Sequence, residues 1–402
     1  MNLIVKKYGG TSVATATKIK NIAKKIVDES RSSKIVVVLS AMGKTTDQLV
    51  SLANKCSKNP DGRDYDLLVS SGEQVSISLL SMAIKQLGKD SIAYTGWQAG
   101  IKTNNTHASA RITQIDTSRI KKSLKEGKIV IIAGFQGINS GSITTLGRGG
   151  SDTSAVAIAA ALKASECQIY TDVDGVYTTD PNVVPKAKKI KKISYEEMLE
   201  MASLGSKVMQ PNSIQDARLN RIDIEVRSSF KNKTGSLITK RKNISTKNII
   251  RGVSFTKNDS KITLVGVKDR PGVAANIFEP LFKNSINVDM VVQNISSYKN
   301  ETDLTFTIKN EDLIKTEKLI KKNNKIIFKK LIIDERVSKV SIVGVGMITT
   351  PGVTYRMFNA LAKKRINIQV ISTSEIKISV LVERKNLKKA VDVLHKEFKL
   401  DY

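Results

Sequence analysis

The chain as far as Ser229 alternates short apolar runs with stretches in which apolar residues recur at helical spacing. The apolar runs predict buried strands at Leu3–Lys7, Lys34–Leu39, Lys128–Ala133 and Gln168–Asp172. The periodic stretches predict helices at Lys18–Ser30, Asp47–Lys55, Glu73–Leu87 and Ser154–Lys163. Strands that are apolar throughout and alternate with helices favour an α/β layer structure with a mainly parallel sheet.

The last part of the chain contains an internal repeat. Ile262–Val267 returns as Val340–Val345, Pro271–Val273 as Pro351–Val353, and Ser285–Val288 as Arg365–Ile368. Further strands are predicted at Asp303–Ile308 and Lys377–Val382. Two copies of a strand, a Pro-Gly turn, a helix and two strands predict two small α+β domains. We place the domains at residues 1–230, 258–335 and 336–402, with a polar linker at 231–257.

Length and composition agree with a multidomain globular protein. The 402 residues are 40% hydrophobic, enough for a substantial core. An unbroken apolar run long enough for a membrane span is absent from the sequence. Met1–Val5 enters a predicted strand directly, without a secretory leader, and Cys56 and Cys167 form no Cys-x-x-Cys pair. These features predict a cytoplasmic protein with two reduced thiols and no membrane partner.

The net charge of +29 raises the alternative of a nucleic-acid-binding protein. The basic residues are mostly lysines spread along the whole chain, and aromatic residues are only 5% of it. Basic runs without interleaved aromatic residues lack the stacking platforms of single-strand binders. The charge therefore favours anionic substrates, with nucleic acid as the lesser alternative.

A glycine-rich turn follows the first predicted strand, in the sequence Lys6-Lys7-Tyr8-Gly9-Gly10-Thr11-Ser12. Two glycines let the backbone approach a phosphate, and the start of a helix offers free N–H groups and the positive end of its dipole. The turn has neither the P-loop nor the Rossmann spacing. Glycines needed only for positive φ are the alternative.

A second glycine-rich segment, Leu146–Ser154, contains three glycines, Arg148 and Asp152 at the start of a predicted helix. It predicts another anion cradle, in which the guanidinium of Arg148 can hold a carboxylate with two parallel hydrogen bonds. The alternative is a flexible turn with Ser151 or Asp152 as a helix cap.

Two further segments carry carboxylates at element ends. Ser70-Ser71-Gly72-Glu73 places a carboxylate at a helix start, where it can receive an amino group or only complement the helix dipole. Tyr170–Tyr177 ends a strand and continues to Asp180-Pro181. Carboxylates at the carboxyl ends of strands commonly line α/β active sites, although Asp-Gly also forms tight turns.

Taken in order, Lys-Tyr-Gly-Gly-Thr-Ser, Ser-Ala-Met-Gly, Ser-Ser-Gly-Glu, Leu-Gly-Arg-Gly-Gly-Ser-Asp and Thr-Asp-Val-Asp-Gly-Val-Tyr resemble the aspartate kinases of the amino acid kinase superfamily. The resemblance covers essentially the whole chain, because the tandem repeat is similar to the paired ACT regulatory domains of that family. It implies a three-layer kinase domain followed by two ACT-type, ferredoxin-like domains. It also implies ATP-dependent phosphorylation of the side-chain carboxylate of L-aspartate, the first step of lysine, threonine and methionine biosynthesis.

The resemblance implies site residues position by position. Lys6 would contact the phosphates of ATP, and Asp152 would orient this active-site lysine. Glu73 would hold the α-amino group of aspartate, and Arg148 would hold a carboxylate. The other amino-acid contacts implied are Ser40, Thr46, Gly149, Gly150 and Ser151, with Thr46 preferred over Ser40.

The remaining nucleotide contacts implied are Tyr8, Gly9, Gly10, Thr171, Asp172, Tyr177, Asn182 and Lys207. Mg²⁺ is implied as a bridge between phosphate oxygens, but no acidic cluster points to dedicated metal ligands. The family usually has Arg where this chain has Asn182, so one guanidinium contact is absent unless a neighbour such as Lys186 replaces it.

The repeats imply feedback control by lysine, threonine or both, bound between paired ACT units. The implied effector contacts are Asp269, Gly272, Val273, Ala274, Asn287, Asp289, Gln293, Asn294, Ser372 and Glu375. ACT pairing also implies a homo-oligomer, and repeats that only dimerise the enzyme are the alternative. A binding protein that senses amino acids on an inactive kinase fold is a further alternative, supported by Asn182 alone.

Overall fold

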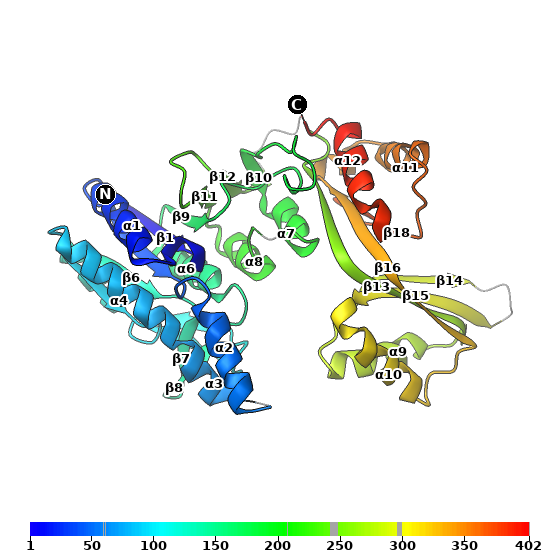
Figure 1. The fold of residues 1–402 in the computed structure, drawn as a ribbon, viewed down its shortest axis with the longest axis horizontal. Coiled ribbons are helices and arrows are strands. Elements are labelled where there is room, and N and C mark those ends of the chain that lie inside the picture. The colour runs from blue at the N-terminus through cyan, green and yellow to red at the C-terminus, as the bar shows by residue number, and fades with distance from the viewer. Residues whose placement is uncertain (59, 61, 207, 242–247, 296–299, 402) are drawn as a thin grey trace. The chain divides into compact units, whose positions relative to one another are not determined.

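The computed structural model describes residues 1–58, 60, 62–206, 208–241, 248–295 and 300–401. The chain folds into two compact units. The first consists of Met1–Val176, Lys189–Ser203 and Lys207–Ser245. The second consists of Tyr177–Lys188, Leu204–Ser206 and Thr246–Tyr402. Figure 1 shows the elements of each unit.

The first unit is built on an eight-stranded sheet in the order β10-β12-β11-β9-β1-β2-β6-β3. Its strands are β1 (Asn2–Tyr8), β2 (Ser33–Leu39), β3 (Ser91–Tyr94), β6 (Ile129–Ala133), β9 (Glu166–Thr171), β10 (Lys192–Ser194), β11 (Ile224–Ser228) and β12 (Ser236–Thr239). Neighbouring strands pair in parallel except β11 and β12, which pair antiparallel. The prediction of a mainly parallel sheet is confirmed.

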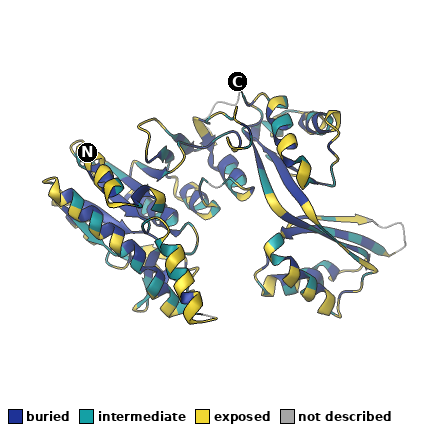
Figure 2. Ribbon diagram, viewed as in Figure 1, coloured by how far each residue is buried: buried dark blue, intermediate teal, exposed yellow. Residues whose placement is uncertain are grey.

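Helices cover both faces of this sheet. The helices of the first unit are α1 (Ala16–Glu29), α2 (Thr45–Cys56), α3 (Gly62–Val69), α4 (Ser71–Gln86), α5 (Ser118–Lys125), α6 (Gly150–Leu162), α7 (Tyr195–Ser203) and α8 (Pro211–Asn220). On one face, α1 and α4 share a core with β1, β2 and β6. The other face of β1 and β2 packs against α6. This helix is rich in alanine, and most of its residues are buried. Figure 2 shows the buried central strands between helices with exposed outer faces.

Several elements of the first unit are absent from the sequence prediction. A small sheet of order β5-β4-β7-β8 consists of β4 (Ile101–Thr103), β5 (Ile112–Ile115), β7 (Gln136–Asn139) and β8 (Ser142–Thr145). Its strands are only three or four residues long, too short to give a period. Helix α3 packs against β8 of this sheet.

The second unit contains both repeats in one six-stranded sheet of order β14-β15-β13-β16-β18-β17. The strands are β13 (Gly252–Lys268), β14 (Asp289–Ile295), β15 (Glu301–Lys309), β16 (Lys330–Val343), β17 (Val370–Thr373) and β18 (Lys377–Glu383). The helices are α9 (Val273–Lys283), α10 (Leu313–Lys322), α11 (Val353–Lys363) and α12 (Leu387–Glu397). The long strands β13 and β16 pair with each other and run through both repeats, so the two repeats share these two central strands.

The domain bounds differ from the predicted ones at the linker. Ser236–Thr239, predicted as linker, form β12 of the first sheet, and β13 already begins at Gly252. Residues 242–247 of the predicted linker lie outside the described residues. Composition does not reveal this strand, because four partly polar residues resemble a linker.

One helical stretch of the described chain, Gly62–Gln86, is long and apolar enough to cross a membrane. It comprises α3 and α4, and half of its most apolar window is buried inside the protein. Ile77, Leu80 and Ile84 of α4 belong to the core against the sheet. This burial is the ordinary reason for an apolar helix in a folded domain.

The core on α4 gives a matched test of stability. We expect Leu80→Ala to lower the free energy of unfolding of the first unit by about 2–5 kcal/mol, because Leu80 is fully buried. Met82→Ala on the same helix should change it by less than about 0.5 kcal/mol, because Met82 is 65% exposed. Trp97 is the only tryptophan, so its fluorescence during urea unfolding reports on this unit alone. Equal losses in both variants would contradict the packing described here.

Candidate functional site

Four neighbouring strands bring the predicted site segments to one edge of the first sheet. The order β9-β1-β2-β6 is parallel, so the carboxyl ends of these strands lie together. Gly9 and Gly10 follow β1, Ser40 follows β2, and Thr171 ends β9. This edge is where open α/β sheets bind their ligands.

The first glycine-rich turn interlocks with the loop after β2. A Cβ on Gly10 would lie 2.8 Å from the Ala41 carbonyl oxygen and 2.9 Å from that of Gly43. The Gly43 N–H donates to the Gly10 carbonyl at 2.9 Å, and the Ser40 N–H donates to the Tyr8 carbonyl at 3.1 Å. Position 10 therefore has no room for a side chain. Its φ is not positive, so the glycine is required by space and not by backbone conformation. The short helix Gly10–Val13 begins at this turn.

Lys7 is the lysine that faces this edge on the α6 side. Its Nζ lies 2.6 Å from Oδ1 of Asp152, and both side chains are nearly buried. A Cβ on Gly9 would lie 3.5 Å from the same Nζ, so the ammonium group sits beside the glycine turn. Asp152 is in the first turn of α6. An ammonium, a glycine turn and a helix N-terminus together form a site for an anion.

Lys6 lies on the opposite face of the sheet, which corrects the prediction that Asp152 orients it. Successive side chains of a strand alternate between faces, so Lys6 and Lys7 cannot share one site. Lys6 is buried beneath Glu29, the last residue of α1, with which it forms an ion pair. Burial lowers the pKa of Lys6 to about 8, with the charge of Arg227 as a further cause.

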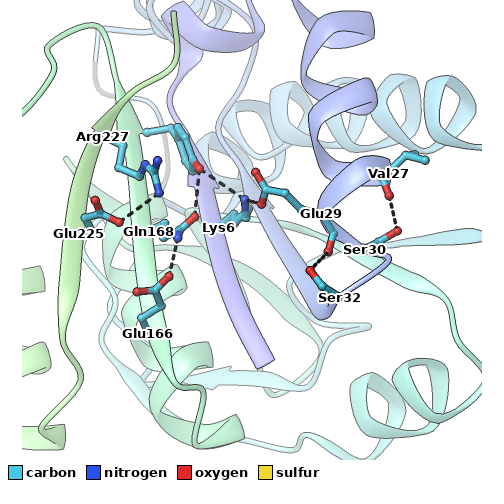
Figure 3. A network of polar contacts seen from close by, with 10 residues as sticks. Lys6, Val27, Glu29, Ser30, Ser32, Glu166, Gln168, Glu225 and Arg227 are labelled. Carbon is cyan, nitrogen blue, oxygen red and sulfur yellow. Dashed lines mark hydrogen bonds and ion pairs between the residues drawn. The ribbon is translucent and has the colours of Figure 1, made fainter. Parts of the chain in front are cut away.

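The surroundings of Lys6 form a closed polar network, drawn in Figure 3. Its ammonium donates to the Tyr170 hydroxyl at 3.4 Å, and that hydroxyl donates to Oε1 of Gln168 at 3.0 Å. Arg227 pairs with Glu225 at 3.2 Å in the neighbouring strand. Tyr170 also stacks on Tyr8, with ring centroids 4.5 Å apart. Tyr8 and Lys6 are thus structural residues between β1, β9 and α1.

The second glycine-rich segment forms the turn before α6. Gly147 and Gly149 both have φ of +73°, a conformation that favours glycine. A Cβ on Gly149 would lie 2.0 Å from Cγ of Gln210. Gly150 and Ser151 open the buried first turn of α6. Arg148 is exposed at the tip and makes no ion pair with any described residue, so its guanidinium is available to a ligand.

Glu73 is a buried carboxylate with an unfilled bonding position. Its Oε1 accepts a hydrogen bond from the Ala41 N–H at 3.1 Å, while Oε2 is buried and has no partner among the described residues. Burial raises the pKa of its carboxyl to about 8, although the bond from Ala41 acts in the other direction. Its exposed fraction is 2%. A buried oxygen without a donor is a site for a ligand that brings N–H groups.

The other predicted contacts of the first unit are only partly brought together. Thr46 is in the first turn of α2, next to the Ala41–Gly43 loop. The Thr171 hydroxyl donates to the exposed Asp172 carboxylate at 2.9 Å, at the end of β9. Lys207 lies outside the described residues. Among the described residues, His, Cys, Asp and Glu side chains gather nowhere in a group of three that could hold a metal ion.

Tyr177 and Asn182 belong to a segment, residues 177–188, that folds with the second unit. The Val253 N–H donates to the Thr178 carbonyl at 2.7 Å, and the Thr178 hydroxyl lies 2.8 Å from Nε2 of the buried His395. The Asn182 N–H donates to the Asp180 side chain at 2.8 Å, closing a turn. This part of the predicted nucleotide site is fixed to α12 of the second repeat.

The predicted effector contacts fall on two parts of the second unit. Asp269, Gly272, Val273 and Ala274 form the turn into α9, where Gly272 has φ of +87°. Asp289, Gln293 and Asn294 are in β14, Asn287 precedes that strand, and Ser372 and Glu375 are in or just after β17. Strands β14 and β17 contact each other, so the repeats meet edge to edge there.

Asp289 already has partners at this junction. Its carboxylate forms an ion pair with Lys339 of β16 and accepts from the Met290 N–H at 2.8 Å. Burial acts to raise the pKa of Asp289, but the charge and hydrogen bond of Lys339, the Met290 N–H and the charge of Lys377 together hold that pKa below its ordinary value. Asp289 therefore links the two repeats through its ion pair with Lys339.

Comparison with known proteins places the two units in known families. Residues 2–228 match the model of the amino acid kinase family, and residues 262–323 and 340–398 match that of the ACT domain. The chain is 50% identical to an aspartate kinase of Pseudomonas putida, over all of this chain and 98% of the relative. It is 47% identical to aspartokinase 2 of Bacillus subtilis, with the same shares covered.

Solved structures agree with these matches. Aspartokinase III of Escherichia coli in complex with aspartate and ADP (R-state) is 26% identical, with a TM-score of 0.79 over 98% of this chain and 99% of that chain. The same enzyme in complex with lysine and aspartate (T-state) is 27% identical, with a TM-score of 0.78 over the same shares. The similarity therefore includes both the kinase unit and the repeats.

The buried carboxyl of Glu73 predicts a pH dependence of stability. Between its ordinary pKa of 4.5 and the folded value of about 8, the folded state holds a proton that the unfolded chain releases. The stability contributed by the neutral carboxyl is present below pH 4.5 and is lost as pH rises toward 8. From pH 5 to pH 8 the wild type should lose on the order of 3 kcal/mol more stability than Glu73→Gln.

Urea unfolding followed by Trp97 fluorescence at a series of pH values measures this difference. Glu126→Gln serves as the control, because the Glu126 carboxyl is exposed and its pKa is lowered by Lys128. That control should follow the wild-type pH curve above pH 5. A Glu73→Gln curve parallel to the wild-type curve would show that Glu73 is ionised in the folded protein.

Proposed function

The chain belongs to the aspartate kinases of the amino acid kinase family, and we propose that it transfers the γ-phosphoryl group of ATP to the side-chain carboxylate of L-aspartate. The product would be 4-phospho-L-aspartate, which enters lysine, threonine and methionine biosynthesis. The observation that carries this proposal is the Lys7 ammonium held by Asp152 beside the Gly9-Gly10 turn.

The transfer requires charge neutralisation more than proton removal. The attacking carboxylate has an ordinary pKa of about 3.9 and is ionised at neutral pH, so no general base is required. One of its oxygens forms a bond to the γ-phosphorus while the bond to the β–γ bridging oxygen breaks, and ADP leaves. Lys7 stabilises the charge on the transferred group, and Asp152 holds the lysine in place.

The amino-acid substrate is recognised at its two charged ends. Oε2 of Glu73, which has no partner among the described residues, accepts a hydrogen bond from the α-ammonium group. Burial keeps this carboxyl neutral in the empty site, and the positive charge of the bound ammonium favours its ionised form. Arg148 binds the α-carboxylate from the tip of the turn before α6. Ser40, Thr46 and the first turn of α6 (Gly149, Gly150, Ser151) surround the substrate.

Nucleotide binding uses the glycine turn and the end of β9. Gly10 offers its backbone N–H to the phosphates, while the N–H of Gly9 donates to the Tyr170 carbonyl at 3.2 Å and fixes the turn. Thr171 and Asp172 contact the nucleoside side. We expect an Mg²⁺ ion to arrive on the phosphates and to keep several of its waters. This ion would neutralise phosphate charge alongside Lys7.

Regulation follows from the repeats. We propose that lysine, threonine or both bind at the α9 turn and the β14–β17 junction and change the activity. Tyr177 and Asn182 fold with the second unit, which gives a physical route from effector to nucleotide segment. We also expect the ACT repeats to pair in a homo-oligomer and the enzyme to be cytoplasmic.

The direct test is the specificity for the acceptor. Purified protein with ATP and Mg²⁺ is expected to release ADP with L-aspartate, and hydroxylamine should trap the acyl phosphate as a hydroxamate. L-Glutamate and N-acetylglutamate serve as acceptor controls and should give little or none. The assay repeated with lysine and threonine tests regulation, and we expect at least one of them to shift the aspartate saturation curve.

Folded protein that gives no hydroxamate with any acceptor would contradict the proposal and favour an amino-acid sensor. Restoring Arg at Asn182 would then show whether the missing guanidinium is the cause. Activity that neither lysine nor threonine changes would remove the regulatory part alone.

A further inference from the structure

A completely buried carboxylate, Asp66, lies outside the residues discussed so far. It is on α3 and its exposed fraction is 0%. Oδ1 accepts from the Ala108 N–H at 3.0 Å and from the Thr145 hydroxyl at 2.5 Å. Oδ2 accepts from Nδ1 of His107 at 2.7 Å and from the same Ala108 N–H at 3.2 Å. This carboxylate therefore ties three separate segments of the first unit together.

Two of these segments form the support of the second glycine-rich turn. Thr145 ends β8, two residues before Gly147, and its carbonyl accepts from the Ala110 N–H at 2.8 Å. A Cβ on Gly147 would lie 3.2 Å from the Ala108 carbonyl oxygen. The loop around His107 and Ala108 is thus packed directly against the turn that carries Arg148.

The loop is held in a costly conformation. Ala108 has φ of +59°, which an alanine rarely adopts and which costs of order 1 kcal/mol or more. The Asp66 carboxylate holds the N–H of this residue with both of its oxygens. Gly62 begins α3 without a side chain, since a Cβ there would lie 2.6 Å from Cβ of His107. Strain and a buried charge at one point indicate a place where geometry is fixed for function.

The third segment connects Asp66 to Glu73. Helix α3 ends at Val69 and α4, which carries Glu73, begins at Ser71. The Ser70 N–H donates to the Asp66 carbonyl at 3.1 Å, so the helical turn continues between them. Nε2 of Gln136 donates to the Ser70 carbonyl at 2.8 Å and ties this junction to β7. A shift of Asp66 would therefore move Glu73 or the Arg148 turn relative to the other.

We propose that Asp66, through His107, Ala108 and Thr145, is a positioning residue that sets the spacing between Glu73 and the Arg148 turn. The inference rests on the proposed function, in which these two residues bind the ends of the amino-acid substrate. A fixed spacing favours the four-carbon acceptor over its homologue with one more methylene. A difference of one methylene is worth about 10–200-fold in specificity. Loss of the spacing should therefore cause a measurable fall in the preference for aspartate over glutamate.

The test compares the Michaelis constants for aspartate and ATP. We expect Asp66→Asn to raise the KM for aspartate by about tenfold or more, because an amide cannot accept all these hydrogen bonds. The KM for ATP should stay within about threefold of the wild type. The preference for aspartate over glutamate in kcat/KM should fall by a similar factor.

Two further variants keep the test valid if Asp66→Asn unfolds. Thr145→Val removes one donor with little change of volume and should raise the KM for aspartate selectively, whereas Thr145→Ser should restore it. Asp64→Asn is the matched control, because Asp64 is on the same helix and its side chain is 74% exposed. This control should leave both constants unchanged.

The outcomes separate the two proposals. If Thr145→Val and Asp66→Asn raise both Michaelis constants equally, or only lower thermal stability, the cluster is structural and this inference fails. If Thr145→Ser behaves as Thr145→Val does, the hydroxyl is not responsible and the inference also fails. An inactive wild-type enzyme would overturn the proposed function, and this inference with it.

Discussion

The alternation of side chains along β1 determines which groups can meet at the site. Lys6 and Lys7 are consecutive, and the strand directs one toward α1 and the other toward α6. Only the second direction leads to the glycine turn, the first turn of α6 and Asp152. The other direction leads into a closed network that stabilises the sheet. One strand thus carries an ammonium group inside a polar network and a second one at the site where we propose that phosphates bind.

The site depends on charges kept away from water and held by few partners. Glu73 has one carboxyl oxygen with a hydrogen-bond partner and one without a partner among the described residues, and burial raises the pKa of this carboxyl to about 8. Asp66, by contrast, is fully bonded and holds a strained loop. Lys7 and Asp152 form an ion pair that is nearly buried. Such arrangements lower the stability of an empty site and raise the selectivity for what fills it.

Sequence patterns predicted the elements with a clear period and missed the short ones. The strands around Ile35 and Ile131 and the helices around Ile22 and Leu80 are confirmed, because their apolar residues follow the packing of a buried sheet. The small sheet of β4, β5, β7 and β8 and the end of the linker were not predictable in this way. Their strands are too short for a period, and their register is set by contacts distant in sequence.

Motifs indicated which segments lie close together, but they did not indicate the direction of a side chain. The glycine turns and Glu73 come together because they follow neighbouring parallel strands or begin buried helices. To decide between Lys6 and Lys7, one must know which face of the sheet each side chain of β1 lies on. Two adjacent lysines in a buried strand do not reveal this. Asp66, His107 and Thr145 are isolated in the sequence and meet only through the tertiary fold.

The central claim is that Lys7, and not Lys6, acts on the transferred phosphoryl group. Its most direct test is to measure kcat for Lys7→Met and Lys6→Met under saturating aspartate and ATP. Lys7→Met should lower kcat by about 10²-fold or more, because it removes the charge that faces the transferred group. Lys6→Met should keep kcat within about tenfold of the wild type and mainly lower thermal stability, because it only disturbs a partly buried ion pair with Glu29. The reverse result, an active Lys7→Met enzyme and a folded but inactive Lys6→Met enzyme, would contradict the assignment of the catalytic face.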